Sequence, residues 1–290
     1  MEKPTTTKEK SHLRKETISA SRITSYQLCG EAFRRRYELG EVRPPGLALI
    51  KGRDFHKLTE TNNKQKIETK EDLPLEEMKD YVSDRVDISF EQEVLLTKEE
   101  KSLGRKKIHG DVKDILVASA GTYRDNCKDV MPREVESFQR LVLPEGMKDI
   151  LYVMDIETVD DKIIDYKFSG KKKNQLDVDS NLGLTAYSLA FESKHGRKPK
   201  EISFHNYVGY ITPKQRELKT FYNHLVTERN HIDYENFLRR AESVIKGIDS
   251  GVFPPAPVGS WKCSRKFCEY WEDCIYVNYA REMAEKENKE

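Results

Sequence analysis

The chain has 290 residues, of which 35% are charged and 37% hydrophobic, and its formal net charge is +1. This length suffices for one large domain or two small ones with a sizeable core. A net charge this close to zero gives no overall attraction to nucleic acid, so any such binding depends on local basic patches. No stretch approaches the roughly 18 apolar residues of a membrane-spanning helix, so a membrane-spanning protein is not expected.

The first residues of the chain are polar and lack the apolar core of a signal peptide. We therefore expect a disordered lead over residues 1–17, a charged tail over 281–290 and a cytoplasmic protein with no membrane partner. Disulfides are rare in that compartment. Three of the five cysteines lie between residues 263 and 274, and in a reducing environment such a cluster favours a metal site over disulfides.

Hydrophobic periodicity divides the chain into a helical first part and a mixed second part. Helical spacing predicts helices at 22–38, 46–60 and 74–86. The polar segment 97–131 gives no clear prediction. Runs of β-branched and aromatic residues predict strands at 134–143, 149–159 and 162–168. They are followed by a helix at 178–194, a strand at 202–211 and helices at 213–229 and 233–249. This order indicates an α/β or α+β plan with one central mixed sheet.

The two strands on either side of residues 159–162 form a candidate hairpin in which polar residues interrupt apolar ones. Side chains alternate across a strand, so Asp155 lies on the face opposite to its apolar neighbours. On the second strand, Asp165 and Lys167 share one face and the apolar residues the other. If the apolar faces share one core, the loop has an odd length and Asp155 lies opposite Asp165. The pattern predicts that the three polar residues converge.

Two carboxylates that approach each other repel unless a cation lies between them, and hard oxygen ligands suit Mg²⁺ or Mn²⁺. A neighbouring lysine can orient or deprotonate an attacking water and can offset charge on a phosphate. Such a set is suited to hydrolysis of a phosphodiester bond. The D-x-K pattern also occurs in ordinary surface strands with one solvated face, and the residues alone leave both interpretations open.

Asp155, a turn and then IIDYK, with Asp165 and Lys167, resemble the core of the PD-(D/E)XK nucleases. The similarity is to their RecB-like branch, which includes CRISPR-associated and phage exonucleases. It implies an α/β fold with a restriction-endonuclease-like core, in which a central mixed sheet is flanked by helices. Three further segments resemble helices of that branch: residues 18–40 with Cys29, residues 51–60 with His56, and residues 183–191 with Tyr187.

The resemblance implies a role for individual residues of this chain. Lys167, Asp155 and Asp165 would be catalytic. The metal ligands would be His56, Asp155, Asp165, the backbone carbonyl of Tyr166 and Glu136. A histidine among carboxylates shifts the preference from Mg²⁺ toward Mn²⁺. On the residues alone, His56 is also compatible with a surface histidine, and Glu136 with a solvated strand residue.

Two positions depart from the pattern of the branch. Tyr152 stands where relatives often have a glycine, three residues before the first aspartate. Gly183 stands where they often have a glutamine that contacts nucleic acid or supports the site. These departures put substrate handling in doubt, but they leave the predicted ligands and Lys167 intact.

The cysteine cluster has the spacing Cys263-x4-Cys268-x5-Cys274. Three thiolates need a fourth ligand to complete a tetrahedral zinc site or a [4Fe–4S] cluster. The resemblance implies that Cys29 is the fourth ligand and that the group is [4Fe–4S], which would join the N- and C-terminal segments. Zinc and free core cysteines remain as alternatives. Cys127 has no partner in this scheme and is expected to be a plain thiol.

The resemblance implies one RecB-like nuclease domain over residues 18–280. Its expected parts are a helical part (18–95), an insertion (96–131), a nuclease core (132–211), and C-terminal helices with the cysteine cluster (212–278).

The expected activity is that of a Mg²⁺- or Mn²⁺-dependent deoxyribonuclease, an exonuclease acting in DNA repair, recombination or phage DNA processing. The substrate would be DNA that is single-stranded or has free ends, and a separate helicase or recombination protein would be a partner. Phosphates would contact basic patches. The alternative is an inactive nucleic-acid-binding or assembly subunit with the same fold. The residues expected to contact DNA are Arg34, Arg35, Lys171, Lys172 and Tyr187.

Overall fold

The computed structural model describes residues 17–143, 148–257 and 259–277. No helix within these ranges is long and apolar enough to cross a membrane. The chain divides into two compact units. Among the described residues, the terminal unit comprises 17–43, 140–143, 148–151, 232–257 and 259–277, and the central unit comprises 44–139 and 152–231.

The sheet of the central unit is formed by β2 (Pro132–Leu141), β3 (Asp149–Thr158), β4 (Lys162–Ser169), β5 (Glu201–Ile211) and β6 (Leu218–Thr227). The strand order is β3-β4-β5-β6, and β2 pairs with β3. β3 is antiparallel to β4, β4 is parallel to β5, and β5 is antiparallel to β6. The predicted central mixed sheet is confirmed.

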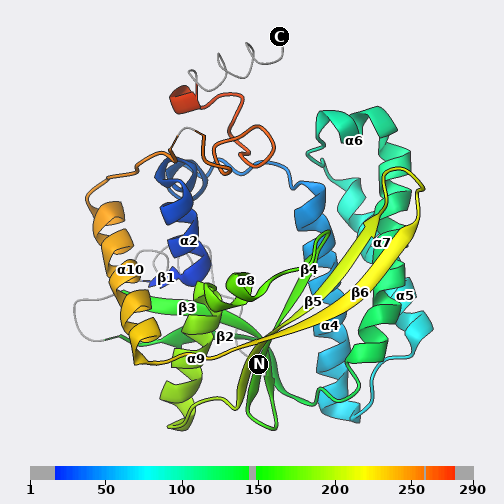
Figure 1. The fold of residues 1–290 in the computed structure, drawn as a ribbon, viewed down its shortest axis with the longest axis horizontal. Coiled ribbons are helices and arrows are strands. Elements are labelled where there is room, and N and C mark those ends of the chain that lie inside the picture. The colour runs from blue at the N-terminus through cyan, green and yellow to red at the C-terminus, as the bar shows by residue number, and fades with distance from the viewer. Residues whose placement is uncertain (1–16, 144–147, 258, 278–290) are drawn as a thin grey trace. The chain divides into compact units, whose positions relative to one another are not determined.

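The helices of the central unit pack on this sheet or on one another (Figure 1). They are α4 (Leu47–Thr69), α5 (Leu75–Glu91), α6 (Lys98–Leu103), α7 (Arg105–Asn126), α8 (Gln175–Asp179) and α9 (Leu182–His195). α4 contacts β4, α7 contacts β5 and β6, and α9 contacts β4 and β5. The main core lies between α4, α5, α7 and the sheet, where Phe55, Val82, Leu116, Tyr166 and Tyr207 are buried. This packing holds α4 against the predicted catalytic strand.

The segment 97–131, for which the sequence gives no clear element, contains α6 and α7. α7 places Ile108, Val112, Leu116, Ala120 and Tyr123 in the same core cluster as α4 and α5. Its apolar residues recur at helical intervals, but many charged residues separate them and mask the pattern. The part expected as an insertion therefore contains a core helix.

The predicted helix over 213–229 is wrong, because this segment contains β6. β6 pairs with β5 along its whole length, from Ile202↔Thr227 to Ile211↔Leu218. Aromatic residues meet across the pair, with Tyr207 opposite Tyr222 and Val208 opposite Phe221. Cross-strand packing of aromatic and β-branched side chains stabilises a strand, and here it outweighs a spacing that is also compatible with a helix.

The terminal unit brings together residues from both ends of the described chain. Its elements are β1 (Thr17–Ser19), α2 (Ala20–Leu28), α3 (Gly30–Phe33), a π-helical turn η1 (Arg34–Glu38), α10 (His231–Asp249) and a 3₁₀ turn η2 (Ile275–Val277). β1 pairs in parallel with Asp149–Leu151 at the start of β3. The amide of Gly30 donates to the carbonyl of Pro254 at 2.7 Å. A Cβ at Gly30 would lie 2.7 Å from backbone atoms of Phe253 and Pro254, so this close approach requires glycine.

The predicted lead and tail fall almost entirely outside the described residues. Of residues 1–17, only Thr17 is described, and it is buried in β1 rather than disordered. The tail over 281–290 lies wholly outside. The prediction of one domain over 18–280 stays a prediction.

Candidate active site

The β3–β4 hairpin aligns the two aspartates that the sequence singles out. Ile156 pairs with Ile164 and Glu157 with Ile163, so continuing this register by one residue sets Asp155 opposite Asp165. The connection between the strands has an odd length of three residues, 159–161. The parity of the apolar residues therefore predicts the hairpin register correctly.

Three side chains from three different elements gather beside this hairpin. His56 comes from α4, Glu136 from β2 and Asp155 from β3, and their ligand atoms lie within 4.8 Å of one another. Nδ1 of His56 lies 3.4 Å from Oδ2 of Asp155. One nitrogen and two carboxylate oxygens at this separation form a donor set for a divalent cation.

Glu136 reaches this group from an unusual backbone conformation. Its φ angle is +49°, in the left-handed region, although it lies inside β2 and is not glycine. Such a residue interrupts the regular alternation of a strand and redirects its side chain, at a cost of about 1–3 kcal/mol. Strained residues of this kind concentrate at functional sites.

The electrostatics of the group favour a bound cation. Burial and the charge of Asp165 raise the pKa of Asp155 to about 8. Burial and the charge of Asp155 raise the pKa of Glu136 to about 7. Burial also lowers the pKa of His56, with Lys167 adding to the effect, so the imidazole is neutral and can act as a ligand. A divalent cation would relieve the repulsion between the carboxylates, and the residues present fit Mg²⁺ or Mn²⁺.

Lys167 and Asp165, which both lie on β4, form an ion pair. Burial opposes the charge of Lys167, but Asp165 and Asp155 outweigh it and raise the pKa of the lysine. Lys167 is therefore an ammonium ion that donates hydrogen bonds and offsets negative charge. Asp165 does not belong to the group formed by His56, Glu136 and Asp155, and its predicted role as a ligand stays a prediction.

Comparison with known proteins identifies the family. The sequence model of the protein family described as "PD-(D/E)XK nuclease superfamily" matches residues 17–275. The chain belongs to this superfamily. Asp155, Asp165 and Lys167 of this nuclease are the residues that resemble its D…D-x-K core.

One solved structure shares the fold of this nuclease. The protein named "Putative exonuclease" from Eubacterium rectale superposes with a TM-score of 0.55 at 12% identity, covering 94% of this chain and 95% of that chain. A second structure, SSO0001, has a TM-score of 0.41 at 15% identity and covers 92% of this chain and 91% of that chain. No curated protein matches the sequence. The predicted restriction-endonuclease-like α/β fold is confirmed.

Tyr166 orients the carboxylate of Asp155. Its backbone N–H donates to Oδ2 of Asp155 at 2.8 Å. Its ring is buried in the core, and the amide of Asn63 donates to its hydroxyl at 3.4 Å. The backbone position beside Asp155 is therefore held by packing on the opposite face of β4. The role of its carbonyl as a ligand stays a prediction.

Glu60 is a residue of this site that the sequence reasoning missed. It lies one turn after His56 on α4 and ion-pairs with Lys57 at 2.5 Å and with Lys64 at 2.6 Å. Its charge contributes to the raised pKa values of both Asp155 and Glu136. The available signal was the spacing of four residues from His56, which places both on one helix face.

Tyr187 and the two departures from the family pattern lie together. Burial, followed by the charges of Asp165 and Asp155, raises the pKa of Tyr187, which lies on α9. The rings of Tyr152 and Tyr187 are 6.1 Å apart. A Cβ at Gly183 would lie 3.0 Å from Oδ1 of Asn181, which caps α9. A glutamine at Gly183 would therefore crowd this cap.

The basic residues predicted to contact DNA differ in their surroundings. Arg34 pairs with Glu31 at 2.8 Å, and Arg35 pairs with Asp273 at 2.7 Å. Both guanidinium groups would have to exchange these partners to bind phosphate. Lys171 and Lys172 are exposed in the turn after β4. The DNA contacts of all four residues stay predictions.

The cysteines of the predicted cluster all belong to the terminal unit and are free thiols. Sγ of Cys29 accepts hydrogen bonds from the amides of Ala32 at 3.5 Å and Ala256 at 3.3 Å. Burial raises the pKa of Cys263, and Cys268, Cys29 and Cys274 add to the effect. Within residues 17–143, 148–257 and 259–277, no three cysteine sulfurs lie within 4.8 Å of one another.

Cys127 lies apart from that group, in the central unit. It is 1% exposed, and burial raises its pKa to about 12. A thiol in such surroundings is unreactive, in agreement with the plain thiol expected from the sequence.

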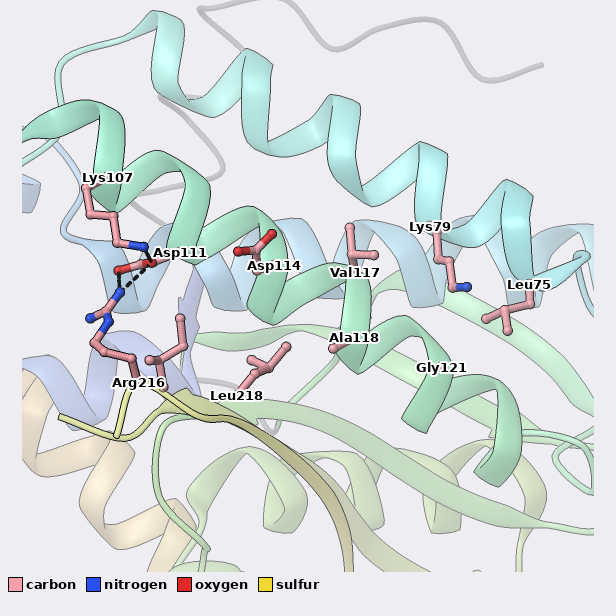
Figure 2. Close-up of a pocket in the computed structure, with 11 residues that line it drawn as sticks. Leu75, Lys79, Lys107, Asp111, Asp114, Val117, Ala118, Gly121, Arg216 and Leu218 are labelled. Carbon is pink, nitrogen blue, oxygen red and sulfur yellow. Dashed lines mark hydrogen bonds and ion pairs between the residues drawn. The ribbon is translucent and has the colours of Figure 1, made fainter. Parts of the chain in front are cut away.

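A cavity of about 540 Å³ lies elsewhere on the central unit, between α5, α7 and the β5–β6 turn (Figure 2). Three of its charged residues form ion pairs, because Asp111 pairs with Lys107 at 2.9 Å and with Arg216 at 2.6 Å. None of the predicted site residues lines it. The predicted catalytic residues therefore belong to the hairpin and not to this cavity.

Proposed function

We propose that this nuclease is a Mg²⁺- or Mn²⁺-dependent deoxyribonuclease that degrades DNA as an exonuclease. The observation that carries the proposal is the placement of Lys167 and Asp165 beside the donor set of His56, Glu136 and Asp155. The superfamily supports hydrolysis of a phosphodiester. The printed name of the structural neighbour, an exonuclease, supports action from a DNA end.

The residues of the donor set would hold the cation. His56 would supply a neutral imidazole nitrogen, and Glu136 and Asp155 would supply carboxylate oxygens. A divalent ion bound there supplies Lewis-acid stabilisation of charge on the phosphate oxygens and helps to form the nucleophile. Tyr166 keeps Asp155 in place through its backbone N–H. Glu60 adds negative charge that attracts a cation to the group.

Lys167 would position the attacking water and stabilise charge on the phosphate. Its raised pKa keeps it protonated, so it acts as a hydrogen-bond donor in this state and not as a base. Asp165 holds the ammonium group on the side of Asp155. A preorganised positive charge of this kind needs no rearrangement during the reaction.

The substrate is proposed to be DNA that is single-stranded or has free ends. Lys171 and Lys172 follow β4 directly and are exposed, so their ammonium groups can bind the phosphates of the DNA backbone. Tyr187 on α9, whose pKa is raised by burial and by the charges of Asp165 and Asp155, would contact the nucleotide at the site.

We also propose that Cys29, Cys263, Cys268 and Cys274 hold a [4Fe–4S] cluster in the terminal unit, with zinc as the alternative. The close spacing of three of these cysteines along the chain and the placement of all four in one unit support the assignment. Neighbouring contacts join the same segments, because the hydroxyl of Tyr26 donates to the carbonyl of Val252 at 2.5 Å and Arg35 pairs with Asp273. The cluster would be a structural cross-link between distant parts of the chain.

A cleavage assay tests the enzymatic proposal. The protein is incubated with end-labelled single- and double-stranded DNA in the presence of Mn²⁺ or Mg²⁺. Cleavage that is lost in both Lys167→Ala and Asp165→Ala supports the nuclease. DNA binding without cleavage under any metal condition would instead support the nucleic-acid-binding subunit, which the departures at Tyr152 and Gly183 would then explain.

A further inference from the structure

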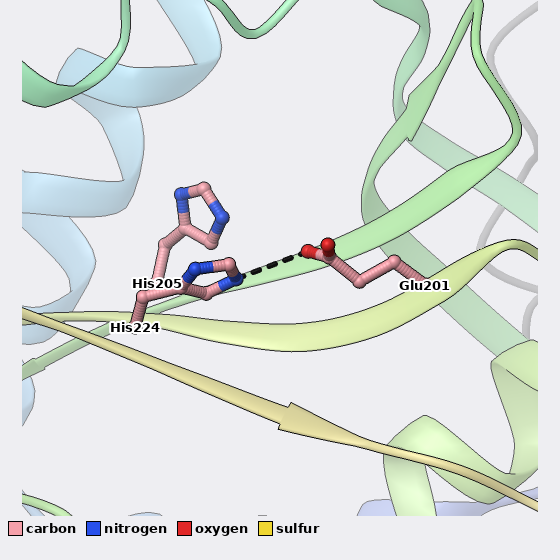
Figure 3. Close-up of side chains that lie close together, drawn as sticks. All are labelled: Glu201, His205 and His224. Carbon is pink, nitrogen blue, oxygen red and sulfur yellow. Dashed lines mark hydrogen bonds and ion pairs between the residues drawn. The ribbon is translucent and has the colours of Figure 1, made fainter.

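A second group of metal-binding side chains lies on β5 and β6 (Figure 3). Glu201, His205 and His224 each offer a ligand atom, and these atoms lie within 4.8 Å of one another. His205 and His224 are directly opposite each other in the antiparallel ladder, with ring centroids 4.8 Å apart. Nε2 of His224 lies 3.0 Å from Oε1 of Glu201. The group therefore combines two imidazoles and one carboxylate.

This group is separate from the proposed active site. His205 is the neighbour of Tyr166 in the parallel β4–β5 register, and side chains at such positions share a face of the sheet. Asp165 and Lys167 point to the other face. None of the residues in the donor set at the hairpin belongs to this group.

His205 is the member whose surroundings point to a ligand. It is 6% exposed, and its Nδ1 atom is buried without a hydrogen-bond partner within the described part of the chain. Burial lowers its pKa to about 3, with His224 and Lys162 adding to the effect, so its imidazole stays neutral. A neutral imidazole can ligate a metal ion through one of its ring nitrogens.

The other two members give a path from solvent. The side chains of His224 and Glu201 are 38% and 22% exposed, respectively. The hydroxyl of Ser203 donates to Oε1 of Glu201 at 2.9 Å and so helps to orient the carboxylate. An ion can reach the group from one side while His205 closes the other.

We propose that Glu201, His205 and His224 bind a divalent transition-metal ion, with Zn²⁺ as the best-matched ion. Two imidazole nitrogens and one carboxylate oxygen are ligands that Zn²⁺ accepts in four-coordinate sites, with water in the fourth position. Mg²⁺ and Ca²⁺ prefer oxygen ligands alone. The ion would link β5 to β6.

The link would stabilise the outer end of the sheet. β6 is the last strand in the order β3-β4-β5-β6, and a strand in that position has neighbours on one side only. A metal that bridges the directly opposed His205 and His224 fixes the register of the pair. The site is therefore structural and independent of catalysis.

Zinc titration of the full chain tests the proposal, using His224→Gln as the variant. His109→Gln is the control, because His109 is a part-exposed histidine paired with Asp87 outside the group. We expect His224→Gln to bind one zinc ion fewer per chain than the wild type, or to bind it at least about 100-fold more weakly. His109→Gln and the active-site variant Asp155→Ala should keep that ion. An unchanged zinc count and affinity in His224→Gln would overturn the proposal.

Chemical modification of the wild-type chain gives a second test that needs no variant. Histidines are modified with diethyl pyrocarbonate with and without Zn²⁺, and the modified residues are mapped by mass spectrometry. Zinc should protect His224 by at least tenfold and leave His109 unaffected. Equal modification of His224 in both conditions would contradict the site.

Discussion

Nδ1 of His56 on α4 lies 3.4 Å from Oδ2 of Asp155 on β3. The two residues come from elements that are far apart in the chain, and the packing of α4 on β4 brings them together. Burial keeps the imidazole neutral, so the pair can act as two ligands of one cation.

Replacing His56 by alanine should change the metal preference of the nuclease. Imidazole favours Mn²⁺ over Mg²⁺, so the loss of His56 should weaken activation by Mn²⁺ about 10–100-fold and activation by Mg²⁺ less. Cleavage rates measured over a range of concentrations of each metal check this. His109→Ala is the matched control and should leave both curves unchanged. An equal loss for both metals would argue against ligation by His56.

Lys167→Ala should lower the cleavage rate by about 10²–10³-fold, the range for removal of one preorganised donor that stabilises charge in the transition state. Binding of DNA should be largely retained, because exposed lysines supply phosphate contacts. Lys172→Ala is the control with the opposite profile, since it should weaken DNA binding and reduce its salt dependence. Single-turnover cleavage and equilibrium binding, measured separately, distinguish the two. A loss of binding alone in Lys167→Ala would exclude the catalytic role.

The metal-free protein should become less stable as the pH rises through the raised pKa of Asp155. The folded-state pKa of about 8 lies above the ordinary aspartate value of 3.8, so between these pH values the folded chain holds a proton that the unfolded chain has released. The contribution of protonated Asp155 to the free energy of unfolding is present in full below about pH 4 and is lost as the pH rises toward 8. Asp155→Asn removes it while keeping an oxygen that can accept from Tyr166.

We therefore expect Asp155→Asn to gain stability relative to the wild type as the pH rises from 5 to 8 in the presence of a chelator. Each unit of difference between the folded-state and unfolded-state pKa of Asp155 corresponds to about 1.4 kcal/mol in the free energy of unfolding. Urea unfolding at several pH values measures the difference. Parallel stability curves for the two proteins would refute the assignment.

Leu116→Ala should destabilise the central unit by about 2–5 kcal/mol, because Leu116 is fully buried in the core cluster. Leu103→Ala is the matched control, since Leu103 is 50% exposed on α6 and should stay within about 0.5 kcal/mol of the wild type. Chemical denaturation measures both. Similar small effects would show that α7 is not part of the core.

Cys29→Ala should remove the bound iron and destabilise the chain if the cluster exists. Protein purified without oxygen should be brown in the wild type and colourless in this variant. Cys127→Ser is the control and should keep the iron, because Cys127 lies in the other unit. If the wild-type protein is colourless and contains stoichiometric zinc, the result contradicts the iron–sulfur cluster and supports a zinc site instead.

Local rules predicted the hairpin, because strand parity depends only on the order of the residues. The alternation around Asp155 and Asp165 allows one shared apolar face and thus one register. The same rules failed for β6, since an isolated run of aromatic and charged residues is compatible with either period. They also left α7 unassigned, because its charged residues mask its apolar stripe.

The sequence by itself determined the hairpin register, the D…D-x-K core and the superfamily, because these depend on spacing along short segments. The family resemblance already implied Glu136 as a ligand beside His56. Only the tertiary structure decided how Glu136 reaches the site, that Glu60 contributes to it and that His205 lies opposite His224. Those groupings depend on a left-handed residue in β2, the packing of α4 and the pairing of β6. Each is a long-range contact whose free energy comes from burial, and spacing along the chain does not encode it.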